Sequence, residues 1–247
     1  MALTTIGFDA DDTLWHSENH FLLTTERFCE LIAPWTQASR LQNPTSSDSS
    51  RRDLIETQLI NIERRNLQLL GYGAKAFTLS MIETAIEISE GEIPASVIAE
   101  ILEWGHELLN HPVELLDGVT AALDALAGSY ELLLITKGDL LHQESKIAQS
   151  GIAPVFSGIE ILSDKTAASY QRVLHQRSVP AKEFLMVGNS VRSDVLPVLE
   201  LGAQAVHVPY HVTWALEEHD STDLQAEQFH SCAHIGELPA LLSSLNC

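Results

Sequence analysis

Two carboxylates stand two residues apart where the first apolar run of the chain ends. The stretch from Leu3 to Trp15 reads LTTIGFDADDTLW, and the run before Asp9 is typical of a buried strand. On extended backbone Asp9 and Asp11 would point to the same side and repel one another unless a cation or a proton intervenes. The stretch therefore predicts a metal ion, a proton donor, or both. Asp and Thr are also common in turns and at helix starts, which is the role we predict for Asp12.

Polar residues follow three more predicted strands. Thr136 comes after the second strand, Lys165 after the third, and Asn189 after the fourth, with Asp194 beyond it. In an open parallel sheet the carboxyl ends of the strands meet at one edge, where ligands bind. Any one of these residues could be a helix cap or a solvated side chain, but chance explains the whole set poorly.

The elements that position these residues alternate between short apolar runs and helical patterns. Strands are predicted in the short run that ends at Asp9 and at 131–135, 158–162, 184–187 and finally 203–208, with helices at 118–127, 141–149, 167–176 and 191–201. Such alternation is typical of an α/β fold, a Rossmann-like parallel sheet with helices on both sides.

A block of helices without a strand separates the first predicted strand from the others. Apolar residues from Phe21 to Ile32 predict one helix after Trp15, and further helices are predicted at 51–70, 76–90 and 94–110, with a polar loop at 36–50. The block therefore predicts an inserted α-helical cap domain at 17–111. Residues 1–16 and 112–247 would form the α/β catalytic core.

Composition limits the class of protein. The 247-residue chain carries 14 basic and 34 acidic residues, a formal charge of −20, which argues against nucleic acid and anionic membrane as partners. A mean hydropathy of +0.04 is that of a soluble globular chain. The three cysteines form no framework and no leader or membrane span is recognisable, so we expect a cytoplasmic protein. His207/His211 and His230/His234 are each four apart, but Pro209 interrupts the first pair, and a histidine metal site is not predicted.

The motifs, in their order, resemble those of the haloacid dehalogenase (HAD) superfamily. They are DxDxT at 9–13, a Thr after a hydrophobic strand at Thr136, an isolated Lys at Lys165, and GNSxxxD at 188–194. The resemblance covers essentially the whole chain, and the helical insertion resembles the superfamily's α-helical cap of the first type. One departure is Asn189, where many members carry Asp, which removes a negative charge but keeps an oxygen ligand.

The resemblance implies a role for each motif residue. Asp9 would be the nucleophile, and Asp11 the general acid and base, with a pKa raised by the crowding of nearby acids. Lys165 would neutralise charge, and Thr136 would donate its hydroxyl to phosphate. The implied cofactor is Mg²⁺. Its implied ligands are the Asp9 carboxylate, the Asp11 backbone carbonyl and Asn189, with Asp194 bound directly or through water.

The function we predict is a Mg²⁺-dependent phosphatase that acts on a small phosphorylated metabolite through an aspartyl-phosphate. Within the superfamily the alternatives are a hydrolytic dehalogenase, which needs no metal, and a phosphomutase. An alternative of another class is a non-catalytic binding or regulatory module on the same scaffold. The sequence does not indicate the substrate, the cap residues that set specificity, or whether the protein is a monomer or a homodimer. Lys137 and Asp139 fit substrate contact and loop solvation equally well, so they stay outside the catalytic set.

Overall fold

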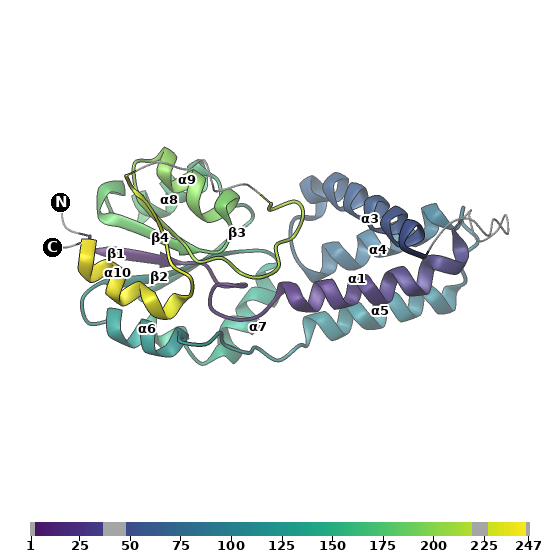
Figure 1. The fold of residues 1–247 in the computed structure, drawn as a ribbon, viewed down its shortest axis with the longest axis horizontal. Coiled ribbons are helices and arrows are strands. Elements are labelled where there is room, and N and C mark those ends of the chain that lie inside the picture. The colour runs from purple at the N-terminus through teal and green to yellow at the C-terminus, as the bar shows by residue number, and fades with distance from the viewer. Residues whose placement is uncertain (1–2, 37–47, 219–226, 246–247) are drawn as a thin grey trace. The chain divides into compact units, whose positions relative to one another are not determined.

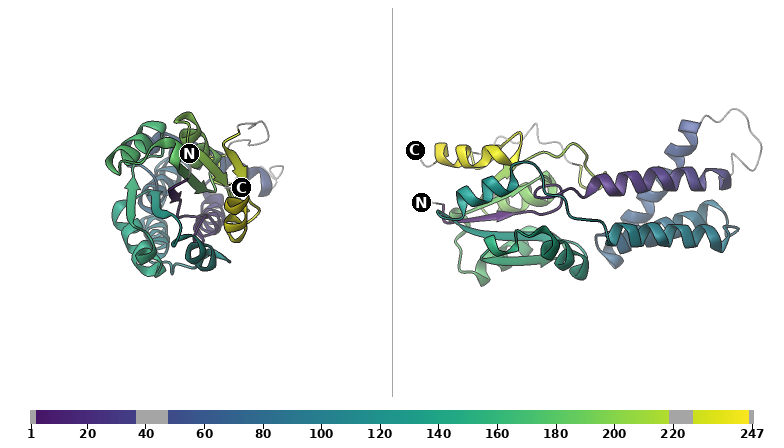
Figure 2. Two further views of the ribbon diagram at one scale, coloured as in Figure 1. Left: turned by 90° about the vertical axis from the view of Figure 1, so that its left-hand side faces the viewer. Right: turned by 90° about the horizontal axis from the view of Figure 1, so that it is seen from below.

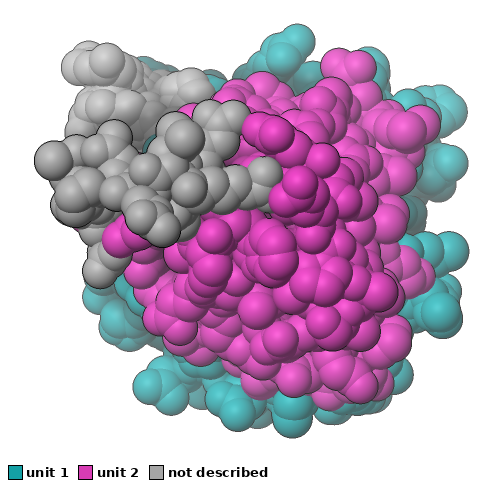
Figure 3. All heavy atoms as spheres, turned by 90° about the vertical axis from the view of Figure 1, so that its right-hand side faces the viewer, with its two compact units in different colours: residues 1–18, 112–247 teal, residues 19–111 magenta. Residues whose placement is uncertain are grey.

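The structure is a computed structural model that describes residues 3–36, 48–218 and 227–245. The chain divides into two compact units, which Figure 3 colours separately. One unit combines Met1–Glu18 with Pro112–Cys247, and the other is Asn19–His111. The two units are described in turn.

The first unit is built on a parallel six-stranded sheet with the order β3-β2-β1-β4-β5-β6. The strands are β1 Thr5–Phe8, β2 Glu131–Lys137, β3 Gly158–Leu162, β4 Phe184–Gly188, β5 Gln204–His207 and β6 Phe229–Ser231. The first strand in sequence lies at the centre of the sheet, between β2 and β4. Residues that follow β1, β2 and β4 are therefore neighbours at one edge.

Helices cover both faces of this sheet, as Figure 1 and the end-on view in Figure 2 show. On one face pack α6 (Val119–Leu126), α7 (Leu140–Ser150) and α10 (Leu238–Leu245), and on the other pack α8 (Ala167–Gln176) and α9 (Leu196–Glu200). Because neighbouring strand residues point to opposite faces, each face receives its own apolar cluster. The predicted α/β class with a Rossmann-like sheet is confirmed.

Buried side chains of β1 and β4 show this alternation. Ile6 and Val187 belong to the cluster on the α6 side, whereas Phe184 and Met186 belong to the cluster on the α8 side. All four are fully buried. The central strands are therefore held from both sides, which fixes the edge where the polar residues emerge.

The second unit is helical throughout its described residues. Its helices are α1 (Glu18–Ile32), which starts in the first unit, α3 (Asp48–Leu70), α4 (Ala74–Ile88) and α5 (Ala95–Leu109). They enclose a second apolar core that includes Phe28, Ile55, Met81, Ile101 and Trp104. Most of the predicted loop at 36–50 lies outside the described residues.

Two sequence predictions about the sheet region were wrong. The strand predicted at 203–208 is not the last one, because the short strand β6 pairs with β5 and is followed by α10. The helix predicted at 191–201 begins as a π-helical turn, Val191–Val195, before α9. A three-residue edge strand gives almost no periodic signal, which is why β6 was missed. Among the described helices, none is long and apolar enough to cross a membrane.

Candidate active site

The predicted site residues lie at the carboxyl edge of the sheet. Asp9 follows β1, and its N–H donates to the carbonyl of Val187 at 2.9 Å, which fixes the backbone there. Thr136 lies near the end of β2, and Asn189 follows β4, the two strands that flank β1. Parallel pairing alone therefore brings these three residues together.

Lys165 forms the centre of a buried charge cluster. Its ammonium donates to Asp9 Oδ1, and to Asp194 Oδ1 at 2.7 Å. The side chains of Lys165, Asp9 and Asp194 are only 1%, 9% and 2% exposed. Asp194 Oδ2 also accepts from the Ser190 N–H at 3.0 Å, and Tyr170 donates to Asp194 Oδ1 at 3.4 Å. Lys165 is therefore not the solvated side chain that an isolated Lys usually is.

Gly188 allows Asp194 to come this close to the end of β4. A Cβ placed on Gly188 would lie 2.2 Å from Asp194 Oδ2. That separation is far inside van der Waals contact, and the neighbouring atoms are buried. The glycine of the GNSxxxD motif is thus required by packing against the buried Asp194 carboxylate.

Burial and charge act in opposite directions on Asp9. Burial raises the pKa of Asp9 and Lys165 opposes the rise, while Asp194 adds to it, and the result is a pKa of about 6. Burial alone would lower the pKa of Lys165, but Asp194 and Asp9 together raise it above its ordinary value. At neutral pH the cluster therefore holds an ammonium ion and a mostly ionised Asp9.

Three oxygens gather beside Asp9 in a way that suits a cation. The terminal side-chain atom of Asn189 that faces the site lies 3.2 Å from Asp9 Oδ2 and from the Asp11 carbonyl oxygen. With its nitrogen in that place, Asn189 donates to both oxygens; with its oxygen there, three oxygen ligands converge. Neighbouring ligands of an octahedral Mg²⁺ at 2.0–2.1 Å lie roughly 3 Å apart, so the donor set fits this ion.

The two carboxylates predicted as ligands, those of Asp9 and Asp194, both contact the Lys165 ammonium. Among the described residues, no group of three or more His, Cys, Asp or Glu side chains is arranged to hold a metal. Both oxygens of Asp194 accept hydrogen bonds from the protein. The set that fits Mg²⁺ is thus one carboxylate, one backbone carbonyl and one amide oxygen, from Asp9, Asp11 and Asn189.

Asp11 has a cation of its own, which the sequence analysis did not identify. Lys146 on α7 donates to Asp11 Oδ1 and Oδ2 at 2.6 and 2.7 Å. The indole N–H of Trp15 donates to Asp11 Oδ1 at 2.6 Å, and Gln143 Nε2 donates to Oδ2 at 3.1 Å. Every one of these groups stabilises the ionised carboxylate.

The expectation that crowding raises the pKa of Asp11 was therefore wrong. Burial does raise it, but Lys146 and the hydrogen bonds from Trp15 and Gln143 outweigh burial, and the pKa falls below its ordinary value. In this arrangement Asp11 is a base rather than an acid at neutral pH. An acid role requires that it first gain a proton.

Thr136 is buried and pre-oriented. Its hydroxyl oxygen accepts from Gln143 Nε2 at 2.7 Å, and the residue is 1% exposed. Because that oxygen already accepts a hydrogen bond, its own hydrogen is directed elsewhere. Gln143 thus contacts Thr136 and Asp11 at once.

The residues kept outside the predicted catalytic set have structural roles. Asp12 accepts from the N–H groups of Ser17 and Glu18 at 2.9 and 3.0 Å, so it caps the start of α1 as predicted, and burial and Asp11 raise its pKa to about 7. Lys137 donates to Glu217 Oε1 at 2.6 Å. Asp139 accepts from the His142 N–H and caps α7.

Sequence reasoning missed Gln143, Lys146 and Glu217. Gln143 and Lys146 are three residues apart on α7, the helix that follows Thr136, and this spacing puts them on one helical face near the sheet edge. That signal was present in the sequence. Glu217 lies in an irregular segment after β5, where no local pattern indicates that it meets Lys137.

Comparisons with known proteins agree with this geometry. The family model of the haloacid dehalogenase-like hydrolases matches residues 3–202. Among solved structures, a haloacid dehalogenase-like family hydrolase from Xanthomonas campestris is 39% identical, with a TM-score of 0.83, and the match covers 99% of this chain and 92% of that one. No curated protein matches the chain.

More distant structures share the fold and differ in activity. A 2-haloacid dehalogenase from Pseudomonas syringae is 17% identical, with a TM-score of 0.61, and the match covers 98% of this chain and 99% of that one. A predicted phosphoglycolate phosphatase from Haemophilus somnus is 18% identical, with a TM-score of 0.60 and 97% coverage of both chains. At this identity the likeness shows the fold alone, so the chemistry must be argued from the site.

Proposed function

The chain belongs to the haloacid dehalogenase-like hydrolases, and from that premise we propose that it is a Mg²⁺-dependent phosphatase acting on a small phosphorylated metabolite. The observation that carries the proposal is that the terminal atom of the Asn189 amide lies 3.2 Å from both Asp9 Oδ2 and the Asp11 carbonyl oxygen, while the Lys165 ammonium contacts Asp9. Oxygen ligands and a cation around one nucleophile suit the transfer of a phosphoryl group.

In the first step Asp9 attacks phosphorus. A bond forms between Asp9 and phosphorus while the bond from phosphorus to the leaving oxygen breaks, which gives an aspartyl-phosphate on the protein. Lys165 sits against Asp9 Oδ1 and would stabilise the charge on the transferring oxygens. Thr136, with its hydroxyl oxygen already bonded to Gln143, would donate its hydrogen to a phosphate oxygen.

In the second step water attacks the phosphorus of the aspartyl-phosphate, and Asp9 and inorganic phosphate are released. Asp11 is held ionised by Lys146, which suits it to accept the proton of that water. For the first step Asp11 must gain a proton and pass it to the leaving oxygen. The monoanionic form of a phosphate monoester carries such a proton into the site.

Asp9, the Asp11 carbonyl and Asn189 would hold the Mg²⁺ ion, with Asp194 contacting it through water. When bound, Mg²⁺ supplies a positive charge to the phosphate oxygens. Asn189 contributes no charge of its own, so the ligands carry one formal negative charge fewer than a site with Asp at this position. In this proposal the helical unit is the cap domain that restricts access of water to the site.

The test is hydrolysis of p-nitrophenyl phosphate by the purified protein, with Mg²⁺ and after its removal by EDTA. We expect turnover only with Mg²⁺, and none in Asp9→Asn, because the amide is not a nucleophile. Asp124→Asn, at an exposed position on α6, is the matched control and should hydrolyse the ester normally. Turnover that survives both EDTA and Asp9→Asn would contradict the proposal.

The rival within the family is a hydrolytic dehalogenase, and one observation favours it. Displacement of halide needs no proton donor, and Asp11 is held in its ionised form. A dehalogenase would use Asp9 to attack carbon and needs no metal, however, so it would leave the convergence of the Asp11 carbonyl and Asn189 beside Asp9 without a purpose, and we prefer phosphoryl transfer for this reason. Metal-independent release of halide from a 2-haloacid would establish the rival.

A further inference from the structure

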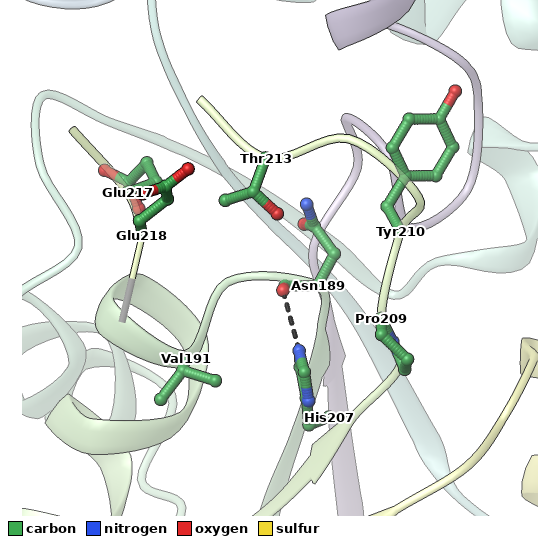
Figure 4. Close-up of a pocket in the computed structure, with 8 residues that line it drawn as sticks. All are labelled: Asn189, Val191, His207, Pro209, Tyr210, Thr213, Glu217 and Glu218. Atoms are coloured by element: carbon green, nitrogen blue, oxygen red, sulfur yellow. Dashed lines mark hydrogen bonds between the residues drawn. The ribbon is translucent and has the colours of Figure 1, made fainter. Parts of the chain in front are cut away.

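A cavity of about 540 Å³ opens beside Asn189, entirely within the first compact unit. It lies next to the residue that faces Asp9 and the Asp11 carbonyl. Figure 4 shows Glu217 and Glu218 on one side of Asn189 and Tyr210 on the other. The residues that line it are Asn189, Val191, His207, Pro209, Tyr210, Thr213, Glu217 and Glu218. The position suits the part of a phosphate ester that lies beyond the phosphoryl group.

The lining has acidic and neutral polar groups but no cation. Among the described residues, the eight that line the cavity include no Lys and no Arg. The His207 Nε2 atom lies 2.9 Å from the Asn189 carbonyl oxygen, so this nitrogen is already in contact with the backbone. Glu218 is exposed and adds a carboxylate to the wall.

Three lysines at the site each form ion pairs with carboxylates. Lys165 contacts Asp9 and Asp194, Lys146 contacts both oxygens of Asp11, and Lys137 contacts Glu217. These pairs bring three ammonium groups together with four carboxylates. If the substrate carried an anionic group besides its phosphoryl group, these three lysines would therefore have no uncompensated positive charge to pair with it.

Arg192 does not change this balance. It neighbours Val191 in sequence, but it is not among the lining residues, and its guanidinium donates to the carbonyl of Leu216. The same contact ties the segment that carries Glu217 and Glu218 to the first turn after β4. This hydrogen bond therefore holds Glu217 and Glu218 next to the site.

We infer that the alcohol released by this enzyme is neutral or cationic, a hydroxyl- or amine-bearing leaving group, and that it carries no carboxylate or second phosphate. The inference rests on the proposed phosphatase function and deepens it. Thr213 offers a hydroxyl group to such a leaving group, and Glu218 offers a carboxylate to an amine. A carboxylate in the cavity would instead face the Glu218 carboxylate, since Glu217 is already paired with Lys137, and like-charge contacts discriminate strongly against wrong partners.

Matched pairs of phosphate esters test the inference. Ethanolamine phosphate and phosphoglycolate both have two-carbon leaving groups, as glycerol 3-phosphate and 3-phosphoglycerate both have three-carbon ones. We expect kcat/KM with Mg²⁺ to be about tenfold or more higher for the neutral or cationic member of each pair, given the cost of like-charge contacts. Equal values, or a preference for the carboxylate members, would overturn the inference.

A charge added to the wall should change this preference. Thr213→Lys places an ammonium group in the lining, and we expect it to raise kcat/KM for phosphoglycolate relative to ethanolamine phosphate several-fold. Thr120→Lys, the same substitution at an exposed position of α6 that lines no part of the cavity, should leave the ratio unchanged. A ratio that moves equally in both variants would show that only the overall charge matters, and the cavity would have no role.

Parallel assays with p-nitrophenyl phosphate test the phosphatase function separately from the inference about the leaving group. If this ester is hydrolysed and the carboxylate-bearing esters are preferred, the inference about the leaving group falls and the phosphatase function stands. If neither p-nitrophenyl phosphate nor any of the four esters is hydrolysed, the phosphatase function falls, and the inference falls with it.

Discussion

Two aspartates from one short stretch are each paired with a lysine, but the pKa values of the two aspartates shift in opposite directions. Lys165 is shared by Asp9 and Asp194, and all three side chains are buried. Among the described residues, Lys146 pairs with no carboxylate other than that of Asp11, and the Asp11 side chain is 29% exposed. Burial raises the pKa of Asp9 to about 6, whereas Lys146 brings the pKa of Asp11 below its ordinary value.

The difference teaches that a lysine's effect depends on how many carboxylates share it and on how much water remains. At Asp9, one ammonium group must balance two buried carboxylates, so a second cation there would stabilise the cluster further. At Asp11, one ammonium group and two other donors balance a single carboxylate. The first arrangement suits a nucleophile that works beside a metal ion, and the second suits a base.

The largest effect should come from removing the shared lysine. Lys165→Ala leaves Asp9 and Asp194 buried without their cation, which should cost about 3–5 kcal/mol of unfolding free energy. Urea unfolding measures this cost, and the phosphatase assay should show no turnover. Lys165→Arg keeps the charge and should recover part of the stability. If Lys165→Ala unfolded at the urea concentration of the natural protein, the cluster would not be the buried one described.

Removing the space for Asp194 should perturb the same cluster more mildly. In Gly188→Ala the new methyl group meets Asp194 Oδ2, and we expect a loss of about 1–3 kcal/mol in stability together with reduced turnover. Gly128→Ala is the matched control, because a Cβ there meets no atom within 4 Å. Equal unfolding temperatures for the two variants would show that the close approach at Gly188 has no energetic consequence.

Removing the unshared lysine should act on catalysis more than on stability. Lys146→Ala frees the Asp11 carboxylate from its main contact, and we expect kcat to fall about tenfold, less than loss of the acid–base group itself would cause. Stability should change by no more than about 1 kcal/mol, because the pair is partly exposed. Lys146→Arg should restore much of kcat at an unchanged KM. If Lys146→Ala had the same kcat as the natural protein, Lys146 would have no role in positioning the Asp11 carboxylate.

A third pair, Lys137 and Glu217, tests whether the rule extends beyond the two aspartates. Glu217 also accepts from Ser190 and Ser193, and although burial would raise its pKa, Lys137 and these hydrogen bonds lower it below the ordinary 4.5. Its stabilising effect is therefore complete above pH 4.5 and is lost as the pH falls through the lower, folded-state value.

Glu217→Gln should therefore cost about 1 kcal/mol at pH 7, in line with a hydrogen-bonded charge at the edge of the site. Unfolding temperatures measured from pH 7 downwards should converge for the variant and the natural protein once Glu217 is protonated in both the folded and the unfolded chain. A difference that stays constant down to pH 3 would show that the loss is one of packing and not of charge.

The sequence predicted those parts of the fold that leave a periodic trace. The central strands and the helices between them follow from apolar runs, and their order places Asp9, Thr136, Lys165 and Asn189 at one edge. Strand β6 is too short for such a trace, and its existence depends on pairing with β5. The π-helical turn after Asn189 also involves tertiary contacts, since Lys165 and Tyr170 both donate to Asp194 there.

The charge state of the site could not be predicted from residue order. The motif assigns Lys165 to Asp9, but only the fold shows that α7 brings Lys146 to Asp11. The Trp15 indole is four residues from Asp11, yet its role depends on the turn at Asp12, whose φ of 62° is left-handed. Burial, which sets the direction of the Asp9 shift, is likewise a property of the packed protein.

The central claim is that Asp9 becomes phosphorylated, and a quenched-flow experiment tests it most directly. The protein is mixed with p-nitrophenyl phosphate and Mg²⁺, quenched in acid within a single turnover, digested, and analysed by mass spectrometry. The account predicts one added phosphoryl group on the peptide that contains Asp9, and a larger share of phosphorylated protein in Lys146→Ala because the base that activates water is misplaced. Hydrolysis of the ester with no phosphoryl group on that peptide at any quench time would contradict it.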